Sequence, residues 1–249
     1  MEKFGRGAAL GAGFIALLLG PGGTHTVTRG GDGATISGQV KFVGQAPVNP
    51  AIDMSEDPDC QAKYQTAPRT ELVTVNPNGT LANVLVYVRA GPPADAPYTV
   101  PTAPVILNQA GCMFHPHVVA VMVNQPLEIQ NSDGLLHNVG GSYLFHGKVN
   151  RPFNVSRPGV GTMATRTFST PEIAIPLDCS VHSWMHAYVS VFAHPFFAVT
   201  GTDGTFTLSG LQPGVYIIDT WQEHYGTQEI TVTVAAGESK IVNIIYAGG

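Results

Sequence analysis

Short runs of apolar residues alternate with polar residues along most of the chain, at the two-residue period of a β-strand with one buried face. Turn-forming residues separate these runs, such as Thr-Asp-Gly at 202–204 and Gln-Pro-Gly at 212–214. The pattern predicts strands at 35–43, 71–75, 81–88, 105–108, 117–123, 127–131, 165–168, 188–192, 205–208, 214–221, 229–235 and 240–246. After the first 20 residues, no stretch of about 12 residues keeps the 3.6-residue apolar period of a helix. We therefore predict an all-β protein.

Glycine and proline account for 29 and 19 of the 249 residues, and charged residues for only 12%. Soluble domains usually contain about a quarter charged residues, so this composition is typical of a β-protein with many turns. The chain has 12 Lys and Arg against 17 Asp and Glu, a net charge of −5. It therefore lacks the basic character of nucleic-acid-binding proteins, and we expect no nucleic-acid partner.

The first 23 residues have the order of an export signal. Lys3 and Arg6 precede an apolar run at 8–20, which is shorter than the roughly 20 residues of a membrane span. No Ala-x-Ala cleavage site follows, so two interpretations stay open: a signal peptide that is removed, or an N-terminal membrane anchor that is retained. Both predict an exported, periplasmic or extracytoplasmic protein whose membrane contact is limited to this segment if it is uncleaved. Residues 24–34 are rich in Gly and Thr, which predicts a flexible tether.

The candidate chemistry lies between residues 177 and 186. Cys179, His182 and Met185 form a Cys-x2-His-x2-Met pattern, and His137 lies upstream in Leu-His-Asn-Val. A thiolate and two imidazoles, with a weak thioether on the axis, are the ligands that suit copper cycling between its one-electron states. Three ligands on one short loop, with the fourth from a distant strand, restrict the geometry in both oxidation states. Taken singly, a buried cysteine or methionine is more often a core residue, so the interpretation depends on the full set.

These residues resemble the cupredoxins, and the short ligand loop is most similar to that of amicyanin. The resemblance implies that His137, Cys179, His182 and Met185 hold one type 1 copper ion. It also implies that Asn138, next to the upstream histidine, ties the two ligand loops together. The expected fold for residues 91–194 is therefore a cupredoxin-type Greek-key β-sandwich.

A second resemblance covers the rest of the chain. Residues 197–216 are similar to the carboxypeptidase regulatory-like, or transthyretin-like, β-sandwich, whose first strands the segments 36–42 and 81–88 resemble. We expect residues 35–90 and 195–249 to form this second, Ig- or transthyretin-like sandwich, with the cupredoxin unit inserted between its early and late strands. The combination resembles exported bacterial cupredoxin proteins of the methylamine-utilisation-like type.

The two remaining cysteines, Cys60 and Cys112, are candidates for a disulfide. Cys60 lies in the long irregular segment 44–69, and export to an oxidising compartment favours a bridge that staples this loop. The alternative is two unpaired buried thiols. Cys112 also begins a Cys-x2-His-x-His pattern with His115 and His117, for which a second metal site and ordinary packing both stay open.

Three further residues near the ligands are candidates for supporting roles. Trp184 stands between the ligand-loop residues His182 and Met185, where we expect its ring to shield the copper. His186 and His194 flank the loop, and they are candidates for an edge used in electron transfer or partner docking. Solvated histidines are the alternative.

The leading functional hypothesis is an exported blue copper protein that carries single electrons between redox protein partners. The alternative is a non-catalytic structural or docking subunit of a respiratory or photosynthetic membrane electron-transport complex, with or without copper. The low charge content suits a permanent interface. The chain has no His-Glu-x-x-His, Gly-x-Ser-x-Gly or phosphate-loop pattern, so we expect no enzymatic activity.

Overall fold

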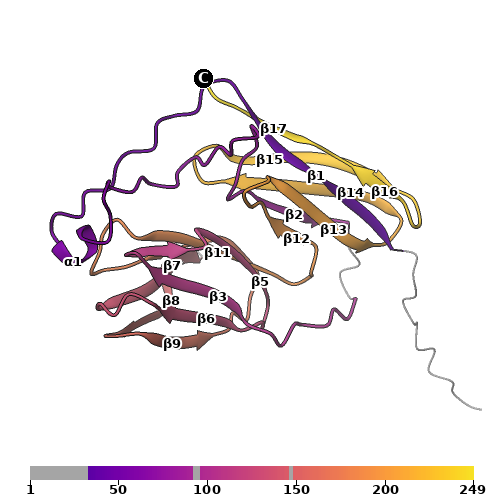
Figure 1. Ribbon diagram of the computed structural model, residues 1–249. Helices are drawn as coiled ribbons and strands as arrows, with labels where there is room; N and C mark the ends of the chain where they lie inside the picture. The colour runs from indigo at the N-terminus through magenta and orange to yellow at the C-terminus, as the bar shows by residue number, and fades with distance from the viewer. Residues whose placement is uncertain (1–32, 92–95, 146–147) are drawn as a thin grey trace, which may run out of the picture. The chain divides into compact units, whose positions relative to one another are not determined.

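The computed structural model describes residues 33–91, 96–145 and 148–249, which lie within one compact unit, Asp32–Gly249 (Figure 1). This part of the chain contains seventeen strands and one short helix, so the predicted all-β class is confirmed. The predicted leader at 1–23, and the tether up to residue 32, lie outside the described residues. Among the helices of the described residues, none has the length and apolarity needed to cross a membrane.

Two sheets form the part of the fold that contains the candidate ligands. One has the strand order β5-β11-β10-β7-β8 and the other β4-β3-β6-β9. Their strands are β3 (Val105–Ala110), β4 (Met113–His115), β5 (Val118–Met122), β6 (Leu127–Asn131), β7 (His137–Phe145), β8 (Lys148–Arg157), β9 (Gly161–Arg166), β10 (Glu172–Asp178) and β11 (His186–Phe192). One large buried cluster, which includes Leu107, Ile129, Leu177 and Val189, draws on both sheets. We call this pair of sheets the first sandwich.

Two other sheets form a second sandwich. One has the order β13-β1-β16, with β17 also paired to β1, and the other the order β12-β2-β14-β15. Their strands are β1 (Ala34–Val43), β2 (Leu85–Ala90), β12 (Phe197–Val199), β13 (Thr205–Leu211), β14 (Gly214–Gln222), β15 (Gly226–Val234), β16 (Ser239–Ile241) and β17 (Ile244–Ala247). β1 pairs antiparallel with β13 and parallel with β16 and β17, which all come from the last quarter of the chain. The boundaries predicted at residues 91 and 194 stay a prediction.

A small buried cluster joins strands of both sandwiches. It contains Leu85 and Tyr87 of β2 together with Val118 of β5 and Phe192 of β11. Close by, Nε2 of His117 donates a 3.0 Å hydrogen bond to the carboxylate of Glu223, which follows β14. The second sandwich therefore contacts β11, the strand that begins directly after the predicted ligand loop.

The alternating pattern predicts strands best where one face is fully buried. The prediction for 127–131 matches β6, whose residues alternate between buried and half-buried positions. The prediction for 71–75 is wrong, because the side chain of Asn49 bonds both the N–H and the carbonyl of Val73 in place of a neighbouring strand. The predicted strand at 240–246 is instead two short strands, β16 and β17.

The strands that the alternating pattern missed contain turn-forming residues or are too short to show a period. β7 contains Gly140 and Gly141, and β10 contains Pro176, residue types that are rare inside strands. β4 and β12 are three residues long, too short to show a period. The long segment before β2 contains α1 (Pro58–Gln61), whose first turn is capped by the side chain of Asp57.

Candidate metal centre

Strand pairing brings the two parts of the predicted ligand set together. β10 ends at Asp178 and β11 begins at His186, so the ligand loop spans 179–185. Asp178 pairs with Gly140 of β7, whose first residue is His137. Inside the loop, the N–H of Met185 bonds the carbonyl of His182 at 3.0 Å, and its carbonyl accepts from Cys179 at 3.3 Å. The loop is therefore a closed turn at the end of the sheet.

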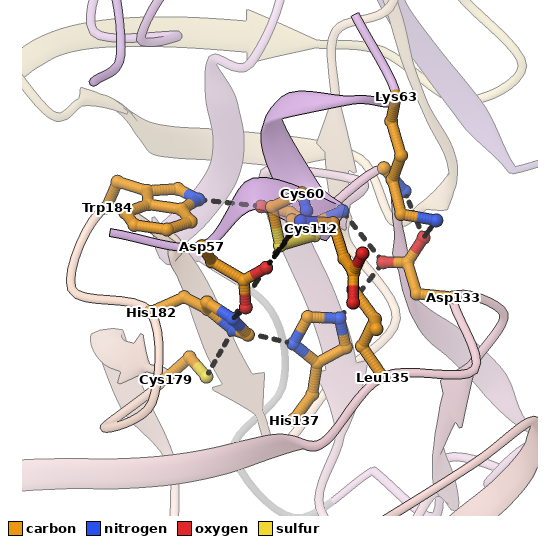
Figure 2. Close-up of a disulfide and its surroundings, with 12 residues drawn as sticks. Asp57, Cys60, Lys63, Cys112, Asp133, Leu135, His137, Cys179, His182 and Trp184 are labelled. Atoms are coloured by element: carbon orange, nitrogen blue, oxygen red, sulfur yellow. Dashed lines mark hydrogen bonds and ion pairs between the residues drawn. A yellow bond between two sulfur atoms is a disulfide. The ribbon is translucent and has the colours of Figure 1, made fainter. Parts of the chain in front are cut away.

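Three candidate ligands converge in a buried position (Figure 2). The Nδ1 atoms of His137 and His182 lie 2.9 Å apart, and the Sγ of Cys179 lies 3.8 Å from Nδ1 of His182. One ligand atom from each of the three residues lies within 4.8 Å of the others. Sulfur and two imidazole nitrogens thus face a common point, which is the donor set that suits copper or zinc.

The environment favours the charged forms of two of these groups. Burial opposes the thiolate of Cys179, but the hydrogen bond from His137 and nearby backbone groups outweigh it and lower its pKa to about 6. Burial also opposes the imidazolium of His137, but hydrogen bonds to Asp133 and Cys179 raise its pKa to about 9. Near neutral pH the metal-free site therefore holds a thiolate beside an imidazolium. A bound metal cation would take the place of that imidazolium proton.

Each histidine contacts a carboxylate through its other nitrogen. Nε2 of His137 lies 3.0 Å from Oδ2 of Asp133, and Nε2 of His182 lies 2.9 Å from Oδ2 of Asp57. Hydrogen bonds of this kind orient metal-binding imidazoles in many proteins. Sequence reasoning missed both aspartates. Asp133 offered a weak signal, four residues before His137, whereas nothing in the sequence connects Asp57 with a histidine 125 residues away.

A disulfide joins Cys60 and Cys112 next to the site (Figure 2). Sγ of Cys60 lies 3.6 Å from Nε2 of His182, so the disulfide and Asp57 together cover the outer edge of this ring. The suggested second metal cluster does not form, because Cys112 is in the disulfide, His115 is exposed on β4, and His117 is bonded to Glu223.

Asn138 bridges the two ligand-bearing segments. Its Oδ1 accepts hydrogen bonds from the N–H of Ser180 at 2.6 Å and from the Ser180 hydroxyl at 2.9 Å. Its Nδ2 donates to Oδ1 of Asn154 on β8 at 2.9 Å. The residue after His137 is therefore tied to the residue after Cys179.

Trp184 and Met185 complete the loop. The ring of Trp184 lies 5.1 Å from the ring of His182, and its Nε1 donates to the carbonyl of Cys112 at 3.0 Å. The indole thus contacts both the candidate ligand His182 and the backbone of Cys112, a cysteine of the disulfide. Met185 is fully buried in the core of the first sandwich. Its role as the axial ligand stays a prediction.

The two flanking histidines have different environments. His186 is exposed and bonds Oδ1 of Asp178 at 2.6 Å. His194 is half-buried among aromatic rings, 5.6 Å from Phe196 and 5.8 Å from Phe192 by ring centroids. Burial lowers the pKa of His194 below its ordinary value. A shared docking edge formed by these two residues stays a prediction.

Comparison with known proteins gives matches at the level of structure only. No family model and no curated protein matches the chain. A purple cupredoxin from Nitrosopumilus maritimus matches 34% of this chain and 97% of its own, at 20% identity and a TM-score of 0.29. A reduced amicyanin mutant matches 43% of this chain and 97% of its own, at 14% identity and a TM-score of 0.31.

A copper-containing nitrite reductase from Thermus scotoductus also matches, over 41% of this chain at 22% identity and a TM-score of 0.29. This chain spans only 25% of that enzyme.

Proposed function

We propose that the protein is a copper-binding electron-transfer protein with one type 1 site. His137, Cys179 and His182 are the strong ligands, and Met185 is the axial ligand. The observation that carries the proposal is the convergence of one sulfur and two imidazole nitrogens within 4.8 Å in a buried position. The low pKa of Cys179 supplies the thiolate that such a site requires.

Copper, when bound, supplies a one-electron couple that passes between two oxidation states. The chain's own contribution is to hold the ligands in one arrangement during this change. Pairing of β7 with β10 fixes the distance between His137 and the loop, and Asn138 ties the two segments together. Burial of the ligands excludes water from the site.

The electron donor and acceptor are proposed to be proteins that dock beside the ligand loop. Leu136, directly before His137, and Val181, directly before His182, are 49% and 48% exposed. Apolar side chains at the surface next to a redox site favour contact with a protein partner. We further propose that the protein is exported, as its leader predicts, and that it carries out no enzymatic step.

The second sandwich is proposed to be of the carboxypeptidase regulatory-like type. A role for it in the second hypothesis, a docking subunit of a membrane electron-transport complex, is supported by its buried contact with β11, the strand that follows the ligand loop. In that case copper is dispensable and the apolar residues beside the loop bind the complex permanently.

The test is the visible absorption and EPR spectrum of protein exported to an oxidising compartment and loaded with Cu(II). The wild type should bind one copper ion with an intense thiolate-to-copper band, and Cys179→Ser should lose the band. Met185→Leu should keep the band and raise the reduction potential, because a weak axial donor is removed. Met54→Leu is the matched control, since Met54 is also buried in the first sandwich but lies outside the loop.

A colourless wild type without stoichiometric copper would refute the electron-carrier proposal and favour the docking subunit. An unchanged potential in Met185→Leu would remove Met185 from the ligand set.

A further inference from the structure

The two candidate ligand histidines are arranged alike, with one ring nitrogen facing the metal position and the other facing a carboxylate. The Nδ1 atoms face each other at 2.9 Å. The Nε2 atoms face Asp133 and Asp57 at 3.0 and 2.9 Å. An Nε2–H that donates to a carboxylate leaves Nδ1 as the atom that a metal would bind, directly in a neutral ring and by displacing a proton in an imidazolium.

Each carboxylate accepts hydrogen bonds from backbone N–H groups, including the N–H of one disulfide cysteine: Cys60 for Asp57 and Cys112 for Asp133. Oδ1 of Asp57 accepts from the N–H groups of Asp59 and Cys60, both at 3.0 Å, and leaves Oδ2 for His182. On the other side, the two oxygens of Asp133 accept from the N–H groups of Gly111 and Cys112, both at 2.7 Å.

Two crosslinks join these halves. The disulfide connects Cys60 with Cys112, and Nζ of Lys63 lies 3.1 Å from Asp133. The segment that carries Asp57 is therefore fastened to the strand ends that hold Asp133. Without the disulfide, the Lys63–Asp133 ion pair and the 2.7 Å hydrogen bond from the Tyr64 hydroxyl to the Gly111 carbonyl would remain, but no covalent link would hold Asp57 against His182.

We propose that Asp57 and Asp133 are positioning residues for His182 and His137, and that the Cys60–Cys112 disulfide fixes the positions of the two aspartates relative to each other. We call the two aspartates and the disulfide the clamp. The clamp keeps a proton on Nε2 of both rings and sets their orientation before any metal binds, so that Nδ1 is the nitrogen left for the metal. This inference rests on the proposed function in that the rings are copper ligands, but its geometry concerns the metal-free chain.

The decisive variant is Asp57→Ser. Serine caps a helix as well as aspartate does, so α1 keeps its first turn, while the acceptor for His182 is removed. Asp53→Ser is the matched control, because Asp53 accepts from the N–H of Ser55 in the same segment and contacts neither histidine. Asp133→Asn tests the other half of the clamp.

The first readout is the ring nitrogen spectrum of ¹⁵N-histidine-labelled, metal-free protein at fixed pH. The wild type should show His182 with its proton on Nε2, and Asp57→Ser should shift the Nε2 signal of His182 and leave His137 little changed. Asp133→Asn should shift the Nε2 signal of His137 more than that of His182. Reduction of the disulfide in the folded wild type should reproduce the His182 shift of Asp57→Ser.

The second readout is the affinity for Cu(II), measured by competition with a chelator. We expect Asp57→Ser to bind about 10- to 100-fold more weakly than Asp53→Ser, the usual effect of removing such a partner. Ring signals in Asp57→Ser equal to those in Asp53→Ser would overturn the clamp, and wild-type signals after disulfide reduction would remove the disulfide from it. Because the ring spectra need no metal, a wild type that binds no copper would refute the proposed function without deciding the clamp.

Discussion

Replacing Asn138 with alanine is the sharpest test of how the two ligand-bearing segments are held together. The substitution removes three side-chain hydrogen bonds, two to Ser180 and one to Asn154. The bond from Gln109 to the carbonyl of residue 138 is retained, since it involves the main chain. At about 1 kcal/mol for each bond, the free energy of unfolding should fall by about 3 kcal/mol.

The assay is urea unfolding of the metal-free protein, followed by fluorescence. Asn154→Ala is the matched control, because it removes only one of the three bonds and should cost about 1 kcal/mol. The Asn138 variant should also bind Cu(II) more weakly than the control, since Cys179 and His137 are no longer tied. If the two variants lose the same stability and the same affinity, Asn138 does not join the ligand segments.

Two further predictions concern the second sandwich and its contact with the first. In Gly38→Ala the new Cβ would overlap the carbonyl of Val242, so the free energy of unfolding should fall by about 1–3 kcal/mol. The control is Gly201→Ala, whose Cβ would face open space and should change the free energy of unfolding by less than about 0.5 kcal/mol. Equal losses in the two variants, measured by thermal or urea unfolding, would contradict the pairing around β1. Burial opposes the charged form of His117, but Glu223 and other carboxylates outweigh it and raise the pKa of His117 above its ordinary 6.5. Protonated His117 should therefore contribute its full stabilisation of the folded state below about pH 6.5, and this contribution should decline as the pH rises through the raised pKa of His117. The stability difference between wild type and His117→Gln, measured by urea unfolding at a series of pH values, should shrink over that range, and a constant difference would contradict the assignment.

The convergence of His137, Cys179 and His182 was predictable because their signal is local or lies in a short motif. Cys179 and His182 are separated by two residues, and the order of the set carries the resemblance that led to His137. The aspartates that face the histidines left no comparable signal. Asp57 reaches His182 only because the long segment 44–69 folds back over the ligand loop, a tertiary contact with no sequence period.

The strands show the same division between local and tertiary causes. β6 and most of β1 follow from alternating apolar residues, which one buried face requires. β10 was missed because Pro176 and Asp178 resemble a turn, although Leu177 and Ile175 are fully buried in its pairing with β11. Proline has no N–H to donate, so the ladder at this position depends on the neighbouring residues.

The pairing of β1 sets a sequence of events for a growing chain. Gln39 on β1 bonds Asn243, a residue 204 positions further along, so the sheet around β1 stays incomplete until nearly the whole chain is available. All strands of the first sandwich, β3 to β11, are available before then, so this sandwich can fold while β1 still has an open edge. Unpaired edges of this kind recruit other chains during folding. A nascent or truncated form that ends before β16 should therefore aggregate through β1 even when its ligand loop is fully formed.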